Sequence, residues 1–121
     1  MSDVKCRCTC PGATVWVTGP TAADRRGAAY ALAERLLAGQ RRVEVLDRLN
    51  DHDTDPERIG LMAEVLARNG IVAIVPCAEE GVTAVRERHA ASGTRYVEVC
   101  ASEPECAETT EAVHGLLTGR R

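Results

Sequence analysis

Aromatic residues are almost absent from this sequence: it has no phenylalanine, one tryptophan and two tyrosines in 121 residues. A core must therefore be built from valine, leucine, isoleucine and alanine. Long apolar runs are missing as well, and none approaches the roughly 20 residues that a membrane-spanning helix requires. The N-terminal segment MSDVKCRCTCP lacks the apolar stretch of a signal peptide. These absences predict a cytoplasmic protein with no membrane partner.

The sequence also lacks an excess of positive charge. Fifteen basic residues stand against 18 acidic ones, which gives a formal net charge of −3. Binding to nucleic acid depends on basic surfaces, so the composition gives no reason to expect such a partner. The apolar fraction of 45% and the charged fraction of 27% are those of an ordinary globular protein. The length supports one compact domain, expected over residues 13–121 after a tail over residues 1–12.

Cysteine, in contrast, is abundant, with six residues. A reducing compartment disfavours a disulfide framework, so thiol, redox or metal roles remain. Cys6, Cys8 and Cys10 alternate along the tail, and in an extended segment their sulfurs share one side. Such a set could hold Zn²⁺ or another soft metal, or it could be a group of thiols with no special role. For Cys77 and Cys100, at the ends of two apolar runs, we expect simple apolar packing.

Apolar runs and helix-like segments alternate along the rest of the chain. The sequence predicts strands over residues 13–17, 42–47, 71–76 and 95–100. It predicts helices over residues 26–38, 55–70, 81–91 and 104–117. Strands that alternate with helices indicate an α/β fold, with a parallel sheet covered on both faces.

The order of the strands follows from their charges. The first and third strands are apolar on both faces, whereas Glu44 and Glu98 lie in the middle of the second and fourth. Charged residues suit the edges of a sheet, so the predicted order is 2-3-1-4. Ligands of open parallel sheets bind beyond the carboxyl ends of the strands, where the strand order reverses. Residues 19–26 follow the first strand and fall at that point.

The segments TVWVTG, AAYALAERLL, VEVLD, ERIGLMAEVLARNGIVAIV, VRERH and YVEVCASEPECAE occur in this order. Together they resemble the adenylylsulfate kinase family, from about Ala13 to Leu117. The resemblance implies a P-loop-kinase-like three-layer sandwich with a four-stranded parallel sheet in that part of the chain. It also implies transfer of phosphate from Mg-ATP to the 3′-hydroxyl of adenylylsulfate, a step of sulfur metabolism.

The segment at the phosphate loop departs from the family pattern. The family has roughly G-L-S-G-S-G-K-S/T where this sequence has GPTAADRR, whose candidate binding residues are Gly19, Thr21, Asp24, Arg25 and Arg26. Asp24 places a carboxylate near the position of the polyphosphate, and like charges a few ångströms apart repel by roughly 1 kcal/mol even in water. Arg25 stands at the position of the lysine. Arg26 replaces the hydroxyl that would bind Mg²⁺, and a cation cannot do so. A degenerate site for ATP and Mg²⁺ is therefore predicted.

A simpler interpretation of the same residues is a solvated first turn of a helix, with Asp24 as its N-cap. Alternatively, Arg25 retains contact with an anion at the helix N-terminus. Asp47 corresponds to the first acid of the family motif D-G-D and is the candidate catalytic residue, or only a residue at a strand end. His89 lies in an expected helix with no evident partner. The strand and substrate-binding elements that the family has beyond the last helix are not expected here.

These features favour a catalytically inactive binding, regulatory or adaptor protein of sulfur-related metabolism. The expected partner is another copy of the chain or a sulfur-metabolism enzyme, in a homo- or hetero-oligomer. It would form through the edge of the fourth strand or through the apolar surface that the family's C-terminal region covers. One alternative is a residual or repurposed kinase or transferase that binds an anionic nucleotide, either ATP or adenylylsulfate. Another is a metal or thiol module that uses Cys6, Cys8 and Cys10.

Overall fold

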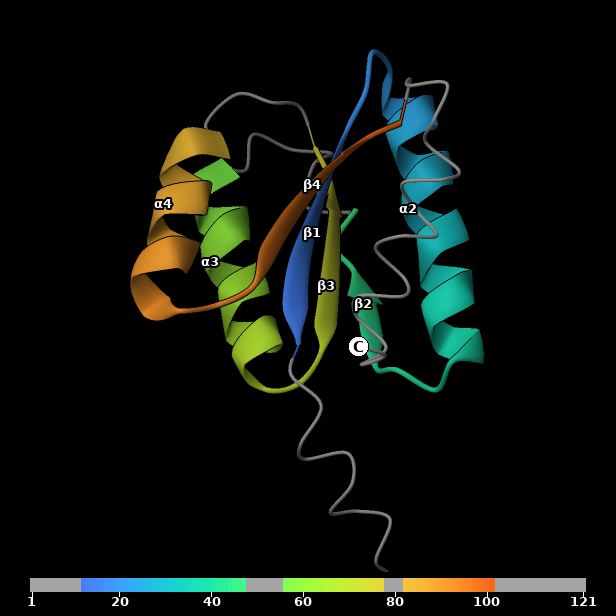
Figure 1. The fold of residues 1–121 in the computed structure, drawn as a ribbon. Helices are drawn as coiled ribbons and strands as arrows, with labels where there is room; N and C mark the ends of the chain where they lie inside the picture. Colours follow the sequence, from blue (N-terminus) through green and yellow to red (C-terminus); the bar gives the residue numbers. More distant parts are fainter. Residues whose placement is uncertain (1–11, 48–55, 78–81, 102–121) are drawn as a thin grey trace, which may run out of the picture.

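The computed structural model describes residues 12–47, 56–77 and 82–101, and all structural statements concern these residues. The elements, in chain order, are β1 (Ala13–Thr18), α2 (Ala22–Ala38), β2 (Val43–Val45), α3 (Pro56–Arg68), β3 (Val72–Pro76), α4 (Val82–Ser92) and β4 (Tyr96–Cys100) (Figure 1). The expected helix over residues 104–117 lies outside the described residues. None of the described helices has the length and apolar character needed to cross a membrane.

The four strands form one parallel sheet in the order β2-β3-β1-β4, which confirms the predicted topology. In the register of the sheet, Val15 of β1 stands beside Ile74 of β3 and Val97 of β4. Both central strands are buried along their whole length. Glu44 and Glu98 are exposed on the two edge strands, as their charges predict.

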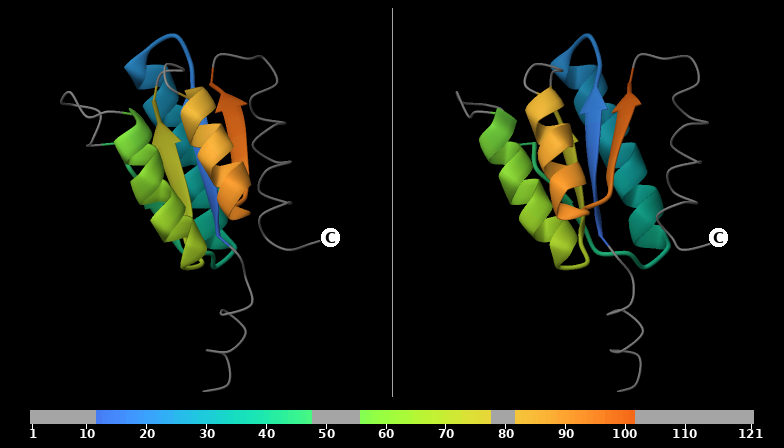
Figure 2. Two further views of the ribbon diagram at one scale, coloured as in Figure 1. Left: turned by 90° about the vertical axis from the view of Figure 1, so that its left-hand side faces the viewer. Right: turned by 60° about the vertical axis from the view of Figure 1, so that its left-hand side comes forward.

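Helices cover both faces of the sheet, with α2 on one face and α3 and α4 on the other (Figures 1 and 2). Successive side chains of the central strands alternate between these faces. The face under α2 buries Ala13, Val15, Val17, Leu32, Leu36, Val72 and Ile74. The face under α3 and α4 buries Trp16, Ile59, Ala63, Ala73, Val75 and Val85. Full burial of one Val, Leu or Ile side chain contributes about 1.5–3 kcal/mol, so aliphatic residues replace the missing aromatics.

The start of α2 differs from the prediction. The helix begins at Ala22, four residues before the expected start, and its N-cap is Thr21. Thr21 has an extended backbone, and its Oγ1 accepts a hydrogen bond from the backbone N–H of Asp24 at 3.0 Å. The interpretation of Asp24 as the N-cap is therefore wrong, because Asp24 lies inside the first helical turn. Two alanines after the cap, which favour helix, explain the early start.

Candidate functional site

The turn between β1 and α2 lies at the carboxyl edge of the sheet, where the sequence places it (Figure 1). It is short, because only Gly19, Pro20 and Thr21 separate the strand from the helix. The end of β4 lies against it, since the backbone N–H of Ala101 donates to the carbonyl oxygen of Thr18 at 2.6 Å. A Cβ atom added at Gly19 would stand 3.1 Å from the Cβ of Ala101. The turn is thus packed closely against the neighbouring strand end.

Arg25 folds back over this turn. Its Nη1 donates a hydrogen bond to the carbonyl oxygen of Gly19 at 2.8 Å. Its Nε is buried and has no acceptor among the described residues. The charged group at the position of the family's lysine is therefore bonded to the backbone of the chain itself.

The first turn of α2 also uses its own backbone donors. The N–H of Asp24 donates to Thr21 Oγ1, and the N–H of Arg25 donates to the carbonyl oxygen of Thr21 at 3.1 Å. In a phosphate loop, backbone N–H groups of successive residues point at the phosphates. At these positions the donors are instead satisfied inside the helix.

Two candidate residues from distant parts of the sequence, Arg26 and Asp47, are brought together. Arg26 Nε lies 3.6 Å from Asp47 Oδ2, and the two side chains are 51% and 16% exposed. Tyr30 Oη donates a hydrogen bond to the same carboxylate oxygen at 2.8 Å. Tyr30 was not predicted as a site residue, although it lies four residues after Arg26 and so shares its helix face. An ion pair with a half-exposed arginine contributes at most about 1 kcal/mol to stability. Together with the hydrogen bond from Tyr30, it gives one oxygen of Asp47 two donors.

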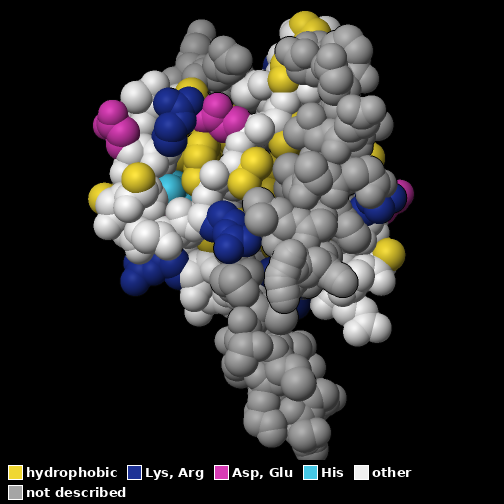
Figure 3. All heavy atoms as spheres, viewed as in Figure 1, with side chains coloured by type: hydrophobic (Ala, Val, Ile, Leu, Met, Phe, Trp, Pro, Cys, Tyr) yellow, Lys and Arg dark blue, Asp and Glu magenta, His cyan; other side chains and the backbone are white. Residues whose placement is uncertain are grey.

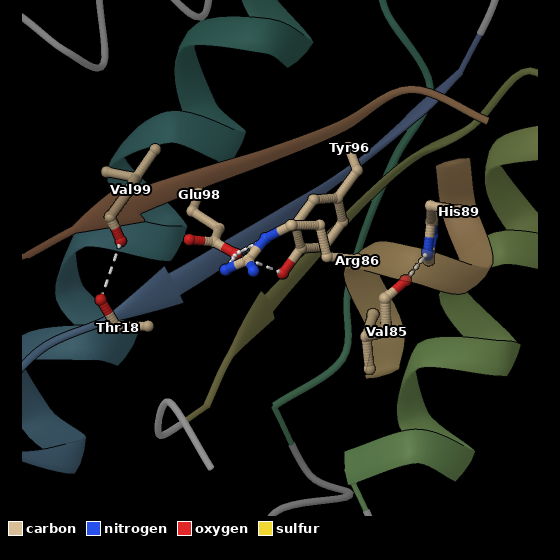
Figure 4. Close-up of polar contacts among 7 residues, drawn as sticks. All are labelled: Thr18, Val85, Arg86, His89, Tyr96, Glu98 and Val99. Carbon is tan, nitrogen blue, oxygen red and sulfur yellow. Dashed lines mark hydrogen bonds and ion pairs between the residues drawn. The ribbon is translucent and has the colours of Figure 1, made fainter. Parts of the chain in front are cut away.

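A second polar cluster lies on the opposite face of the sheet and was missed. His89 of α4 is fully buried, with Nδ1 at 2.9 Å from the carbonyl oxygen of Val85 (Figure 4) and Nε2 at 2.8 Å from Thr14 Oγ1. A carbonyl oxygen only accepts, so Nδ1 carries the hydrogen and Nε2 accepts from the threonine hydroxyl. The sequence shows no evident partner for His89, and the structure supplies two, Val85 and Thr14. No signal along the sequence could have found the pair, because a core contact joins residues from two separate elements.

Next to this histidine, Tyr96 of β4 and Arg86 of α4 share the carboxylate of Glu98. Tyr96 Oη donates to Glu98 Oε2 at 3.0 Å, and Arg86 donates to the same oxygen from Nη2 at 2.6 Å and Nε at 3.1 Å (Figure 4). Burial, followed by the charge of Glu98, raises the pKa of the Tyr96 phenol. The hydrogen bond and charge of Glu98 raise the pKa of Arg86. Basic, acidic and apolar side chains lie side by side on the side of the molecule that Figure 3 shows.

Metal ligands do not gather in the part of the chain that the structure describes, where no group of three or more His, Cys, Asp or Glu side chains could hold an ion. The proposed metal ligands Cys6, Cys8 and Cys10 lie outside the described residues. Among the residues that the structure describes, Cys77 and Cys100 are the cysteines, and they are not bonded to each other. Cys77 packs against the apolar cluster under α3 and α4, as expected for a small apolar side chain.

Comparison with known proteins finds adenylyl-sulfate kinases that are similar to this chain. The chain is 37% identical over 78 residues to an adenylyl-sulfate kinase of Picosynechococcus sp., a match that covers 53% of this chain and 44% of the relative. It is 30% identical over 124 residues to a probable adenylyl-sulfate kinase of Synechocystis sp., which covers 91% of this chain and 70% of the relative. No family model matches the chain.

Solved structures agree with these relatives. A cysteine-to-alanine mutant of the Mycobacterium tuberculosis APS kinase superposes with a TM-score of 0.72 at 24% identity, covering 88% of this chain and 98% of that one. The same kinase in complex with AMPPNP and APS superposes with a TM-score of 0.67 at 25% identity, covering 92% and 74%. The sheet order 2-3-1-4, with helices on both faces, is thus that of the P-loop kinases. Together with the identity over 70% of the Synechocystis protein, this fold shows that the chain belongs to the adenylyl-sulfate kinase family.

Proposed function

We propose that this chain is a member of the adenylyl-sulfate kinase family that does not transfer phosphate and acts as a binding, regulatory or adaptor protein in sulfur metabolism. The observation that carries the proposal is the hydrogen bond of 2.8 Å between Arg25 Nη1 and the carbonyl oxygen of Gly19. A cation at this position assists a kinase only when it faces the phosphates. Here the guanidinium faces the backbone of the turn, so ATP would have to displace it before binding.

The first turn of α2 adds two obstacles to a polyphosphate. The N–H groups of Asp24 and Arg25 are already bonded within the helix, so they are not offered to a ligand. Asp24 is exposed in the same turn, and its negative charge opposes a polyphosphate. These residues therefore do not fit a bound triphosphate as they stand.

Binding of a magnesium ion is disfavoured at the neighbouring position. Arg26 occupies the place of the hydroxyl ligand, and a guanidinium repels a divalent cation. Asp47, the remaining candidate carboxylate, is held by Arg26 Nε at 3.6 Å and Tyr30 Oη at 2.8 Å. Magnesium would have to compete with both donors for the same oxygen. We derive no step of phosphate transfer from these residues.

The proposed role is then association with a protein partner, and β4 is the element that supports it. Among the described strands β4 pairs with β1 alone, so its other edge has no described strand beside it. An edge of this kind is a template for a further strand. We propose a second copy of the chain or a sulfur-metabolism enzyme as the partner.

Titration calorimetry and a phosphate-transfer assay test the catalytic half of the proposal. The full chain is titrated with ATP and with adenylylsulfate, each with and without Mg²⁺, and the Synechocystis relative serves as the positive control. We expect no magnesium-dependent binding of ATP at micromolar concentration and no 3′-phosphorylated product. Micromolar binding that requires Mg²⁺, or turnover that Arg25→Ala abolishes, contradicts the proposal.

A repurposed anion or nucleotide site is the second candidate, and one observation favours it. Within the part of the chain that the structure describes, Arg25 Nε is buried without an acceptor, a costly state that a bound anion could relieve. The calorimetric titrations without Mg²⁺ separate this candidate from the first, because it requires adenylylsulfate or ATP to bind without the metal. Arg25→Lys is the diagnostic variant, since it removes Nε but keeps a positive charge.

The metal or thiol module remains a separate prediction, because Cys6, Cys8 and Cys10 lie outside the described residues. Elemental analysis of protein purified without chelator tests it. The hypothesis predicts a stoichiometric metal that is lost in the triple Cys→Ser variant. Metal content that is the same in both proteins contradicts it.

A further inference from the structure

A groove of about 340 Å³ lies between α3 and α4, and no part of the proposed function uses it. These two helices stand side by side on the face of the sheet opposite α2, as both views of Figure 2 show. Ligand pockets in proteins have volumes of about 300–1,000 Å³, so the groove has room for a small molecule.

The floor of the groove is apolar. Gly60 and Val85 meet there so closely that a Cβ atom added at Gly60 would lie 2.7 Å from Val85 Cγ2. His89 also lines the floor, but both of its ring nitrogens are bonded to groups of the chain, so it offers a ligand its carbon surface. Leu61, which is 42% exposed, lines the groove on the α3 side. An apolar group can therefore rest on this floor.

Arg88 of α4 supplies a restrained positive group. Its Nε donates to Glu64 Oε1 at 2.7 Å, and the two side chains are 59% and 2% exposed. Burial alone would raise the pKa of Glu64, but hydrogen bonds from Ser92 and Arg88 and the charge of Arg88 outweigh it, so the pKa is lowered and Glu64 stays ionised. A buried carboxylate thus fixes one edge of the guanidinium. The two terminal nitrogens have no partner in the described part of the chain and can form a fork around an anion.

Arg58 supplies a second positive group from α3. It lines the same groove, is exposed, and has no hydrogen bond or ion pair to the described residues. Glu57 also lines the groove and offsets one of these positive charges. The groove therefore suits a ligand with one or two negative charges better than a polyphosphate.

We propose that this groove binds a small organic anion: a carboxylate, or a phosphate or sulfate monoester, that carries an apolar group. The anionic group binds the terminal nitrogens of Arg88, with Arg58 as the second contact, and the apolar group lies on Gly60, Val85 and Leu61. Glu64 is a positioning residue, because it acts through Arg88. The site is separate from the turn at Gly19, which lies at the carboxyl edge of the sheet at the start of α2.

An amide NMR titration of the full chain with phenyl phosphate tests the proposal, with inorganic phosphate and benzyl alcohol as the charge-only and ring-only probes. We expect saturable shifts of the amides of Gly60, Leu61 and Val85 with phenyl phosphate. Each partial probe should bind at least tenfold more weakly. Arg88→Gln should lower the affinity for phenyl phosphate at least tenfold, and Arg58→Gln should lower it severalfold.

Arg86→Gln is the matched control, because Arg86 lies on the same helix but is paired with Glu98 outside the groove. It should leave the affinity unchanged. Arg88→Lys keeps the charge and the fold while removing the fork, and it should still lose most of the affinity. The proposal is overturned if phenyl phosphate fails to saturate, if its shifts centre on the turn at Gly19, or if Arg88→Lys and Arg58→Gln both bind normally. Shifts centred on the turn at Gly19 would instead support the repurposed anion site, whereas the other outcomes do not bear on ATP binding, so the two proposals remain distinguishable.

Discussion

Thr14 and His89 are joined in the core by a hydrogen bond of 2.8 Å between Oγ1 and Nε2, although 75 residues separate them along the chain. The bond ties the central strand β1 to α4. Both side chains are fully buried, so neither has water as an alternative partner. The pair therefore fixes how α4 lies on the sheet.

Replacing Thr14 by valine keeps the volume but removes the hydroxyl that donates to His89 Nε2. A buried polar atom left without its partner costs about 1–3 kcal/mol. We expect Thr14→Val to lower the free energy of unfolding by this amount in urea denaturation. Thr83→Val, at an exposed position of α4, is the control and should change the stability by less than about 0.5 kcal/mol. Equal stability of the two variants would show that the Thr14–His89 bond contributes nothing.

The ion pair of Glu64 with Arg88 predicts a dependence of stability on pH. The pKa of Glu64 is lower in the folded chain than its ordinary value of 4.5. A lowered pKa means that the ionised carboxylate stabilises the fold above pH 4.5, and that this contribution disappears as the pH falls through the lower native value. Glu64→Gln should cost about 1 kcal/mol at neutral pH, a low value for a charged hydrogen bond because Arg88 is largely exposed.

Urea denaturation of the native chain and of Glu64→Gln, from neutral pH down to acid pH, measures this contribution. The difference in stability should stay constant at neutral pH and shrink once the pH passes below 4.5. Glu87→Gln, which removes a carboxylate at an exposed position on α4, is measured in parallel as the comparison. A difference between the native chain and Glu64→Gln that does not vary with pH would rule out a linked carboxylate.

The raised pKa of Tyr96 predicts the opposite behaviour in alkali. Burial and the nearby charge of Glu98 favour the neutral phenol, so its contribution to stability is present below the ordinary value of 10.0 and is lost as the pH rises beyond it. Ultraviolet titration should show a tyrosine that ionises late. Tyr96→Phe should remove this late step, whereas Tyr30→Phe should leave it in place. Glu98→Gln should move the step to lower pH, and an unchanged step in that variant would count against the role of Glu98.

Much of the fold could be predicted because its determinants are local. Strands β1 and β3 are apolar on both faces and therefore occupy the centre, while Glu44 and Glu98 mark the edges. The start of α2 was predicted wrongly, although the signal was present. Thr21 and Asp24 have the spacing of an N-cap and the third residue of its helix, which is a common start signal.

The candidate site was predictable only in part. Arg26 and Tyr30 share a helix face, so their nearness follows from the sequence, but their contact with Asp47 depends on how β2 lies beside α2. The fold of Arg25 back onto Gly19 is a choice of side-chain conformation that no pattern of residues encodes. The partner of His89 depends on packing between separate elements, and for that reason sequence patterns cannot reveal it.

Gly60 and Gly27 provide a last test, because the same substitution should have opposite effects at the two positions. A Cβ atom at Gly60 would lie 2.7 Å and 2.9 Å from the two methyl carbons of Val85. Valine has little rotamer freedom in a helix, so α3 and α4 would have to separate. We expect Gly60→Ala to destabilise the chain by about 1–3 kcal/mol. Gly27 lies in α2 with nothing within 4 Å of such an atom, and Gly27→Ala should stabilise the chain by about 0.5–1 kcal/mol.

The origin of the Gly60 effect is tested by combining it with Val85→Ala, which removes both colliding methyl groups. If the collision is the cause, Gly60→Ala should cost much less in the Val85→Ala background than in the native chain. The coupling between the two substitutions, measured by a double-mutant cycle in urea, should then be on the order of 1 kcal/mol. Additive effects would show instead that the cost of Gly60→Ala does not come from a collision with the methyl groups of Val85.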